Sequence, residues 1–250
     1  MAKIEKQILV VKHNSLINAT SKYKYDTNEL KLICCLIATI NNQKEKDFET
    51  KFVNLKDLNF SDKAITNTTY ITELCESVMS KPFRLGKGVY NWFSGLVYDS
   101  GVLSFRFDPD LKPFLLELKD NFTRYHINDI LKLRSSYSIQ VFELLTQYKT
   151  IGERTMTIKD LRGVLKIPDG YRNPDITRLL ETIQSDLKQN THLDFSFTFK
   201  KLGRSFHSIN FAIKDNYEHI EKTKQERKKK RTEGTITLSS RLKGLKLEDH

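Results

Sequence analysis

The sequence predicts an α+β fold made of two tandem winged-helix domains followed by a basic C-terminal tail. A segment containing Lys-Asp-Leu occurs at 54–58 and again at 157–161. The same order of predicted elements surrounds both copies, as expected of an internal repeat. That order is helix, strand, helix, helix and hairpin, which is the order of a winged helix-turn-helix. In this fold, the second of two short helices can enter a DNA major groove.

The first repeat begins with an amphipathic helix in which Leu30, Ile33 and Ile37 fall at three- and four-residue steps on one face. A short helix follows a β-rich run, and Asn54 is suited to cap it. Ser61 or Asp62 is expected to begin the next helix. The expected ranges are a helix over 28–41, a strand over 48–53, a short helix at 54–58, a helix over 61–80 and a hairpin with strands at 95–98 and 102–107.

The second repeat follows the same pattern. Ile139, Phe142 and Leu145 lie on one face of its first helix. Thr157 is suited to cap the short helix, and Asn173-Pro174 to begin the longer one. The expected ranges are a helix over 136–149, a strand over 154–157, a short helix at 157–161, a helix over 173–189 and strands at 193–199 and 206–213.

A 250-residue chain has room for two domains and a tail. The expected divisions are an N-terminal winged-helix domain at 1–125, a C-terminal one at 126–215 and a basic tail at 216–250. Residues 119–134 are expected to link the domains. Within this linker, 121–124 has the polar character of a connection, and 125–128 is expected to be a strand leading into the second domain.

The charge of the chain favours a polyanionic partner. Lys and Arg number 42 against 31 Asp and Glu, which gives a formal net charge of +11. Residues 222–231 hold seven Lys or Arg and one Glu, so this run accounts for +6 of the total. The run is either a disordered, solubilising tail or an additional phosphate-binding arm, and the sequence leaves both open.

The residue types required for catalysis are not grouped in this sequence. The six histidines are isolated from one another, so the two-histidine metal site of a nicking nuclease is not expected. Gly86-Lys87-Gly88 lacks the hydroxyl residue of a P-loop and is expected to form a turn between helix and wing. We therefore expect neither an enzyme nor a bound cofactor or metal. Three cysteines without paired spacing and no apolar run of membrane-spanning length indicate a cytoplasmic protein.

The segment 131–149, which contains Leu-Arg-Ser-Ser-Tyr-Ser-Ile-Gln-Val-Phe-Glu-Leu-Leu, resembles the signature of the initiator replication proteins of theta-replicating, iteron-containing plasmids. Asn28-Glu29-Leu30, Trp92-Phe93 and the segment 107–116 also resemble that family, in the same order and at similar spacing. The resemblance extends from about Asn14 to Ile213. Phe142, where the family often has Tyr, and the Arg-Asn-Pro sequence before the 173–189 helix depart from the family pattern.

The resemblance implies a non-enzymatic initiator of DNA replication. Such a protein binds double-stranded DNA at origin repeats, the iterons, as a monomer, helps to open the adjacent AT-rich duplex, and recruits the host initiator and helicase. Dimers of these proteins often repress their own promoter. A transcriptional repressor with tandem winged helices is the alternative, distinguished by a single inverted repeat in its DNA. A primase or nicking nuclease would need clustered carboxylates or paired histidines.

Helical periodicity places Ile176, Leu180 and Leu187 of the 173–189 helix in the core and turns Arg178 outward. Arg178 is the first candidate for base recognition, because a guanidinium pairs bidentately with guanine. A solvated arginine, or one paired with Glu181, is the structural alternative. His207 and the lysines of the second wing are expected to bind phosphates. The candidate DNA contacts of the second domain are Arg172, Asn173, Thr177, Arg178, Ser185, Lys188, Lys200, Lys201 and Arg204.

The first domain is expected to contact DNA weakly or to serve mainly in dimerisation. Its 61–80 helix has Ile71, Leu74, Cys75 and Val78 on the apolar face. The opposite face is expected to expose Glu73, Glu76, Ser77 and Ser80, and two glutamates there disfavour phosphate. The candidate DNA contacts of this domain are Lys63, Thr66, Thr69, Arg84 and Lys87.

Overall fold

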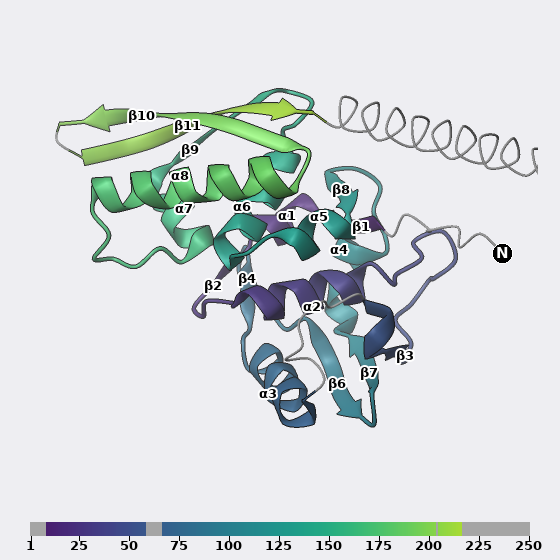
Figure 1. Ribbon diagram of the computed structural model, residues 1–250. Coiled ribbons are helices and arrows are strands. Elements are labelled where there is room, and N and C mark those ends of the chain that lie inside the picture. Colours follow the sequence, from purple (N-terminus) through teal and green to yellow (C-terminus); the bar gives the residue numbers. More distant parts are fainter. Residues whose placement is uncertain (1–8, 59–66, 204, 217–250) are drawn as a thin grey trace, which may run out of the picture. The chain divides into compact units, whose positions relative to one another are not determined.

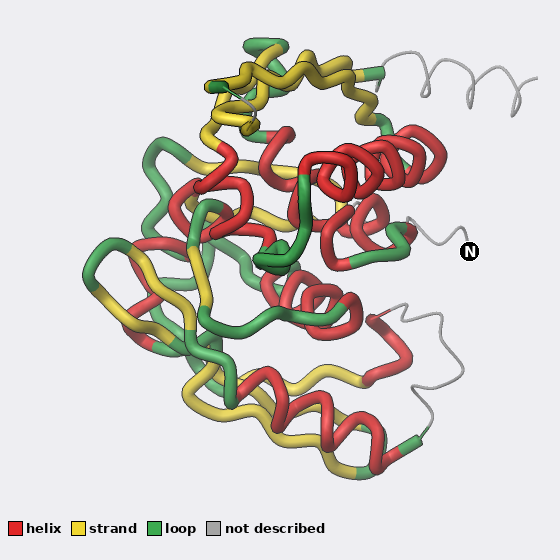
Figure 2. Tube along the Cα trace, turned by 90° about the vertical axis from the view of Figure 1, so that its left-hand side faces the viewer, coloured by secondary structure: helices red, strands yellow, loops and turns green. Residues whose placement is uncertain are grey.

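The computed structural model describes residues 9–58, 67–203 and 205–216. The described residues through Lys214 form one compact unit. Figures 1 and 2 show one sheet at the top and another at the bottom of this unit, with helices between them. The candidates Lys63, Thr66 and Arg204 and the basic run at 222–231 lie outside the described residues. The helix expected to begin at Ser61 or Asp62 begins at Thr68 instead, where the Asn67 side chain accepts a hydrogen bond from the Thr69 backbone N–H.

The first winged helix has the expected order of elements. Its sheet has the antiparallel order β3-β7-β6, and the β6-β7 turn uses Ser100 and Gly101 at φ 48° and 89°, a conformation that favours glycine. Leu55 and Leu58 of the Lys-Asp-Leu segment are buried. The elements are α2 (Thr27–Ile37), β3 (Lys51–Asn54), the 3-10 helix η1 (Leu55–Leu58), α3 (Thr68–Met79), β6 (Phe93–Asp99) and β7 (Val102–Phe107).

The second winged helix repeats this topology. Its sheet order, β10-β11-β9, matches β6-β7-β3 strand for strand, which agrees with the predicted duplication. Thr157 caps α7 as expected, since its side chain accepts a hydrogen bond from the Asp160 backbone N–H. The elements are α6 (Ser136–Thr146), β9 (Glu153–Thr157), α7 (Ile158–Leu165), α8 (Asn173–Asn190), β10 (Leu193–Leu202) and β11 (Ser205–Asp215).

Two helices end earlier than their apolar pattern predicts. α2 ends at Ile37 and not at 41, and the next backbone bonds, from Thr39 to Leu36 and from Ile40 to Ile37, join residues three apart. α6 ends at Thr146 and not at 149, and Tyr148 bonds to Leu145 in the same way. Bonds between residues three apart form a tighter turn that is no longer α-helical. The apolar residues of this turn still face the core, so the apolar pattern extends beyond the end of the α-helix.

The linker is folded, contrary to the expectation of a polar connection at 121–124. β8 (Phe122–His126) pairs antiparallel with β1 (Leu9–His13), and α5 (Ile127–Lys132) begins where the strand was expected to continue. Thr123 and Tyr125 are buried. The Thr123 hydroxyl donates to Asn14 Oδ1 at 2.6 Å. This bond allows a polar side chain to be buried, and a search for alternating apolar residues therefore does not identify the strand.

A small third sheet was not expected from the sequence. It has the order β2-β4-β5, with β2 (Thr20–Ser21), β4 (Phe83–Leu85) and β5 (Gly88–Tyr90). The Gly86-Lys87 turn therefore joins two strands and does not lead directly from helix to wing. β2 packs against α7, so this sheet links the first winged helix to the second.

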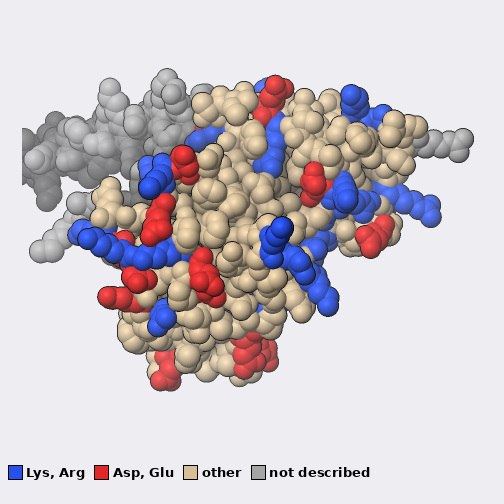
Figure 3. Space-filling model, turned by 180° about the vertical axis from the view of Figure 1, so that it is seen from behind, with Lys and Arg blue, Asp and Glu red and all other residues tan. Residues whose placement is uncertain are grey.

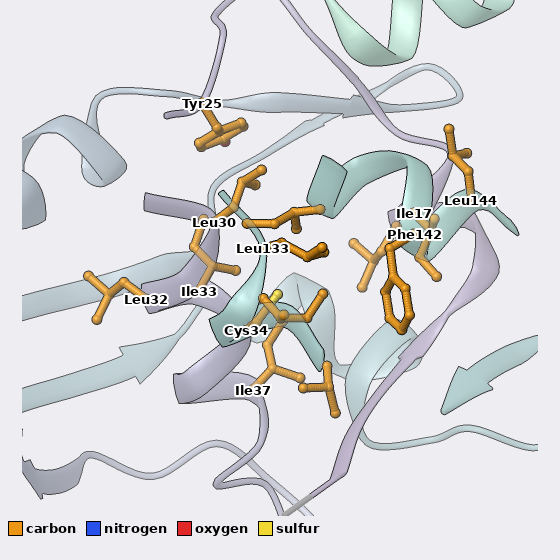
Figure 4. Close-up of a cluster of buried hydrophobic side chains, with 14 of the residues drawn as sticks. Ile17, Tyr25, Leu30, Leu32, Ile33, Cys34, Ile37, Leu133, Phe142 and Leu144 are labelled. Atoms are coloured by element: carbon orange, nitrogen blue, oxygen red, sulfur yellow. The ribbon is translucent and has the colours of Figure 1, made fainter. Parts of the chain in front are cut away.

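The two winged helices share a continuous core. α6 packs against α2 on one side and against α7 and α8 on others. Figure 4 shows Leu30, Ile33 and Ile37 of α2 in one cluster with Leu133 and Phe142. The remaining elements of the described chain are α1 (Asn14–Ile17), the 3-10 helix η3 (Pro109–Leu111) and α4 (Lys112–Leu115). Among the described helices, none is long and apolar enough to cross a membrane.

A buried polar cluster lies within this core. Lys12 of β1 forms an ion pair with Glu143 of α6 at 2.5 Å between Nζ and Oε1, and both side chains are at least 93% buried. The Tyr125 hydroxyl donates to the same carboxylate. The Cys34 thiol of α2 lies 3.7 Å from Glu143 Oε1. Four segments, β1, β8, α2 and α6, are thereby joined through one carboxylate.

Candidate nucleic-acid interface

Helix α8 separates an apolar face from a polar one. Ile176, Leu180, Ile183 and Leu187 are buried, as predicted, and Leu179 packs at the margin of the core. Pro174 lies in the first turn, where a proline needs no hydrogen-bond partner. The outward face is exposed over the full length of the helix, and it consists of Arg178, Glu181, Thr182, Ser185, Lys188 and Gln189.

The turn between α7 and α8 is held by one arginine. The Arg162 guanidinium donates to the Pro168 carbonyl at 3.0 Å and to the Tyr171 carbonyl. Lys166, which ends α7, has φ 55° in the left-handed region. Because Arg162 lies in α7 and its acceptors lie in the turn, these bonds fix where α8 begins relative to α7.

The predicted residues of α8 differ in their freedom to contact DNA. The Arg178 guanidinium has no hydrogen bond or ion pair among the described residues, and the expected alternative pairing with Glu181 is not formed there. Thr177 is half-buried, and its hydroxyl donates to the Asn173 carbonyl at 3.0 Å. Lys188 is 70% exposed but lies 3.7 Å from Asp194, which partly neutralises its charge. Arg172 and Ser185 are exposed, at the start and in the fourth turn of the helix.

The second wing extends from α8 as a long hairpin. Lys200, Lys201 and His207 are exposed on it, as expected for phosphate contacts. The Lys201 ammonium lies 5.8 Å from the centre of the Phe206 ring, within the range of a cation–π contact. The wing therefore supplies positive charge on a hairpin that packs against α8.

The first winged helix presents a more acidic surface. Glu73 and Glu76 of α3 are exposed, as are Ser80, which caps the end of this helix, and Thr69, a predicted contact. Ser77 was expected to face away from the core but is half-buried, because its hydroxyl donates to the buried Glu29 carboxylate, which also pairs with Lys81 at 2.5 Å. In Figure 3, acidic side chains predominate at the lower end of the molecule, the end where Figure 1 shows α3 and the β6-β7 turn.

The basic candidates of the first winged helix lie on the small third sheet. Arg84 is exposed in β4 and pairs with Thr20 of β2, and Lys87 is exposed in the turn that follows. Since β2 packs against α7, this sheet brings Arg84 to the side of the second winged helix.

Comparison with known proteins identifies the family. A family model described as "Initiator Replication protein, WH1" matches residues 9–146, and a second, "Initiator Rep protein, WH2", matches residues 157–213. The chain is a member of the initiator replication protein family. A replication initiation protein from Escherichia coli is 25% identical over 229 residues, which covers 83% of this chain and 70% of the relative. Members of this family are initiators with winged-helix DNA-binding domains.

The structure of this initiator adds two candidates that the sequence analysis missed. Lys22 and Lys24 are exposed in the loop after β2, and the Lys24 ammonium lies 4.0 Å from the centre of the Tyr137 ring. The alternation Lys-Tyr-Lys-Tyr at 22–25, basic residues interleaved with aromatic ones, was the available signal. In the described part of this initiator, no group of three His, Cys, Asp or Glu residues is placed to hold a metal ion.

Proposed function

We propose that this protein is a sequence-specific replication initiator that binds repeated sites at a plasmid origin as a monomer. It then promotes opening of the adjacent AT-rich duplex and recruits the host initiator and helicase. The observation that supports this most directly is the exposed face of α8, where the Arg178 guanidinium has no hydrogen bond or ion pair to the described residues and a basic wing follows the helix. The family match and the net charge of +11 support the same proposal.

The proposed division of work follows from the charge of each surface. α8 enters the major groove of one repeat, where Arg178 pairs with a guanine and Arg172 and Ser185 lie close to the same strand. Lys200 and Lys201 bind phosphates, which fixes the position of the protein without specifying the sequence. The exposed Glu73 and Glu76 of α3 repel phosphates, so the first winged helix contributes less to recognition.

Replacing Arg178 by alanine tests this assignment. The R178A variant should bind a repeat from the DNA beside the coding region about 1 to 3 kcal/mol more weakly, and the preference for one base pair should relax. Fluorescence anisotropy with the repeat, with single-base variants of it and with a scrambled duplex measures both effects.

The matched control is R124A, which removes another exposed arginine, on β8, outside the proposed DNA contacts and the proposed dimer interface. It should bind the repeat as the wild type does. An equal loss by R178A on the repeat and the scrambled duplex would instead make Arg178 a phosphate contact.

The arrangement of binding sites distinguishes an initiator from a repressor. An initiator should protect several direct repeats next to an AT-rich segment, spaced by whole helical turns if the copies bind on one face of the DNA. Footprinting on the DNA beside the coding region gives this arrangement. One inverted repeat without an AT-rich neighbour would favour the repressor.

We further propose that a homodimer represses the protein's own promoter and that the first sheet forms its interface. Phe52 of β3 and Val97 of β6 are 71% and 60% exposed. Both pair with Ser104 of β7, so they lie in one row on the outward face of the sheet. An exposed apolar row on the winged helix that is less suited to DNA favours association with a second copy.

A further inference from the structure

The tip of the second wing combines an exposed leucine with two exposed lysines. Leu202, the last residue of β10, is 73% exposed. Lys200 and Lys201 precede it and are also exposed. Because side chains alternate along a strand, Lys200 shares a face of the ribbon with Leu202 and Lys201 lies on the other face. Leu202 contributes little to the core, and it is flanked by charges that attract phosphate.

The wing behind this tip is stiffened by aromatic contacts. Phe199 of β10 and Phe206 of β11 stack with ring centres 3.8 Å apart and planes 5° from parallel. Phe197 contacts Phe199 at 5.5 Å and Phe195 at 6.2 Å, and Phe195 is 2% exposed in the core. A continuous series of rings therefore connects the core to the tip and restricts the bending of the hairpin.

We propose that Leu202 inserts from the minor groove between two stacked base pairs while α8 occupies the adjacent major groove. Lys200 and Lys201 bind the phosphates of the two strands that border the insertion. Proteins that bind the minor groove insert apolar side chains in this way, and the step partly unstacks and kinks by roughly 20 to 90°. Pyrimidine–purine steps such as TA open most easily, so an AT-rich step is the expected target.

This inference rests on the proposed function and extends it, because it names a residue that deforms the DNA and the class of base step it enters. An exposed leucine could also contact a protein partner. Two observations favour DNA as the occupant. The two lysines beside Leu202 attract phosphate, and β10, which contains Leu202, packs against α8.

A duplex repeat containing 2-aminopurine at one A·T position at a time tests the insertion. Wild-type protein should raise the fluorescence of the probe at one step, because unstacking relieves quenching. L202A should still bind the repeat but lose this rise, and L202F, which keeps an apolar wedge, should retain it. The matched control is I151A, which removes another apolar side chain, 68% exposed, at the opposite end of the same sheet.

Bending of the same repeat, measured by energy transfer between dyes at its two ends, provides a second readout. Wild type and I151A should bend the DNA by about 20° or more, and L202A should bend it less. Thermal unfolding confirms that the exposed substitutions leave the fold intact.

The outcomes separate the insertion from the proposed function. Wild-type protein that binds the repeat without a fluorescence rise at any position overturns the insertion alone, as does an unchanged rise with L202A. Wild-type protein that shows no preference for the repeat over a scrambled duplex overturns both.

Discussion

Glu143 lies where four segments of the chain meet, and its charge is balanced inside the core. Burial is the largest influence on the pKa of Lys12 and would lower it, but the charge and hydrogen bond of Glu143 together with the Cys34 thiol outweigh burial, and the pKa is raised. The ion pair therefore forms in the folded protein at neutral pH. Its stabilisation of the fold is fully present below the ordinary lysine pKa and is lost as pH rises through the raised value.

Removing one partner of this pair should be costly. We expect E143A to lower the free energy of unfolding by about 3 to 5 kcal/mol, because it leaves the Lys12 ammonium buried without its partner. Urea unfolding at pH 7 measures this loss. The double variant K12M/E143M should be less destabilised than E143A, since both charges are removed. A loss below about 1 kcal/mol for E143A would contradict the assignment of a buried pair.

The exposure of a single residue could be predicted from the sequence, whereas its side-chain partners could not. The outward position of Arg178 and the burial of Ile176 follow from helical periodicity and are confirmed. The pairing of Lys188 with Asp194 joins a helix to a strand, and the half-buried Ser77 bonds to a glutamate of another helix. Contacts of this kind depend on how elements pack against one another, and the residue pattern within one element gives no information about that packing.

At the scale of elements, the β3-β7-β6 sheet has one buried and one exposed face. Leu103 and Phe105 face the core, whereas the row formed by Phe52, Ser104 and Val97 faces outward. β3 is also an edge strand of four residues. In the proposed dimer, the apolar row and the edge of β3, which pairs with no other described strand on that side, would meet a second copy of the chain.

A charge placed in this row should weaken the proposed dimer. We expect F52D to remain monomeric at concentrations where the wild type associates, because a carboxylate would be buried without a partner. Sedimentation equilibrium over a range of concentrations measures this. V89D introduces the same charge at an exposed valine of β5 and should associate as the wild type does. Equal association of F52D and wild type would place the interface elsewhere.

The main helices and hairpins were predictable because each repeat supplies local signals, such as the Thr157 cap and the apolar stripe of α8. β2 was missed and β8 was predicted only in part, at 125–128, because both strands are short and their partners are distant: β1 pairs with β8 across more than a hundred residues. β4 and β5 form a local hairpin, but each has three residues, and their Gly86-Lys87 turn was assigned to a connection between helix and wing. Turn glycines and alternating residues reveal strands only where hairpins are local. The domain boundary at residue 125 stays a prediction.

At the scale of the whole molecule, buried ionisable groups make the fold sensitive to alkali. Burial raises the pKa of the Cys34 thiol to about 12 and that of Cys75 to about 11, where the Glu76 charge adds to the effect. Burial also raises the pKa of Cys35, Tyr25 and Tyr125. In each case the unfolded chain loses its proton at lower pH than the folded one, so stability falls once pH exceeds the ordinary value.

The free energy of unfolding should therefore decline above about pH 9. Each such group should lower it by at most roughly 1.4 kcal/mol per pH unit. Urea unfolding between pH 7 and 11 measures the slope. C75A should begin from a lower stability at pH 7, because it leaves a small cavity, but should decline less steeply between pH 9 and 11. A slope identical to that of the wild type would show that Cys75 is not responsible.

The bonds from Arg162 to the Pro168 and Tyr171 carbonyls have a thermodynamic consequence for binding. A turn that is already ordered loses no conformational entropy when α8 enters the groove, so more of the contact energy contributes to affinity. The heat-capacity change of association then reflects the surface buried against DNA without a contribution from folding of the turn. α8 also meets each sequence in the same orientation, and mismatched sites are disfavoured because the helix does not adjust to them.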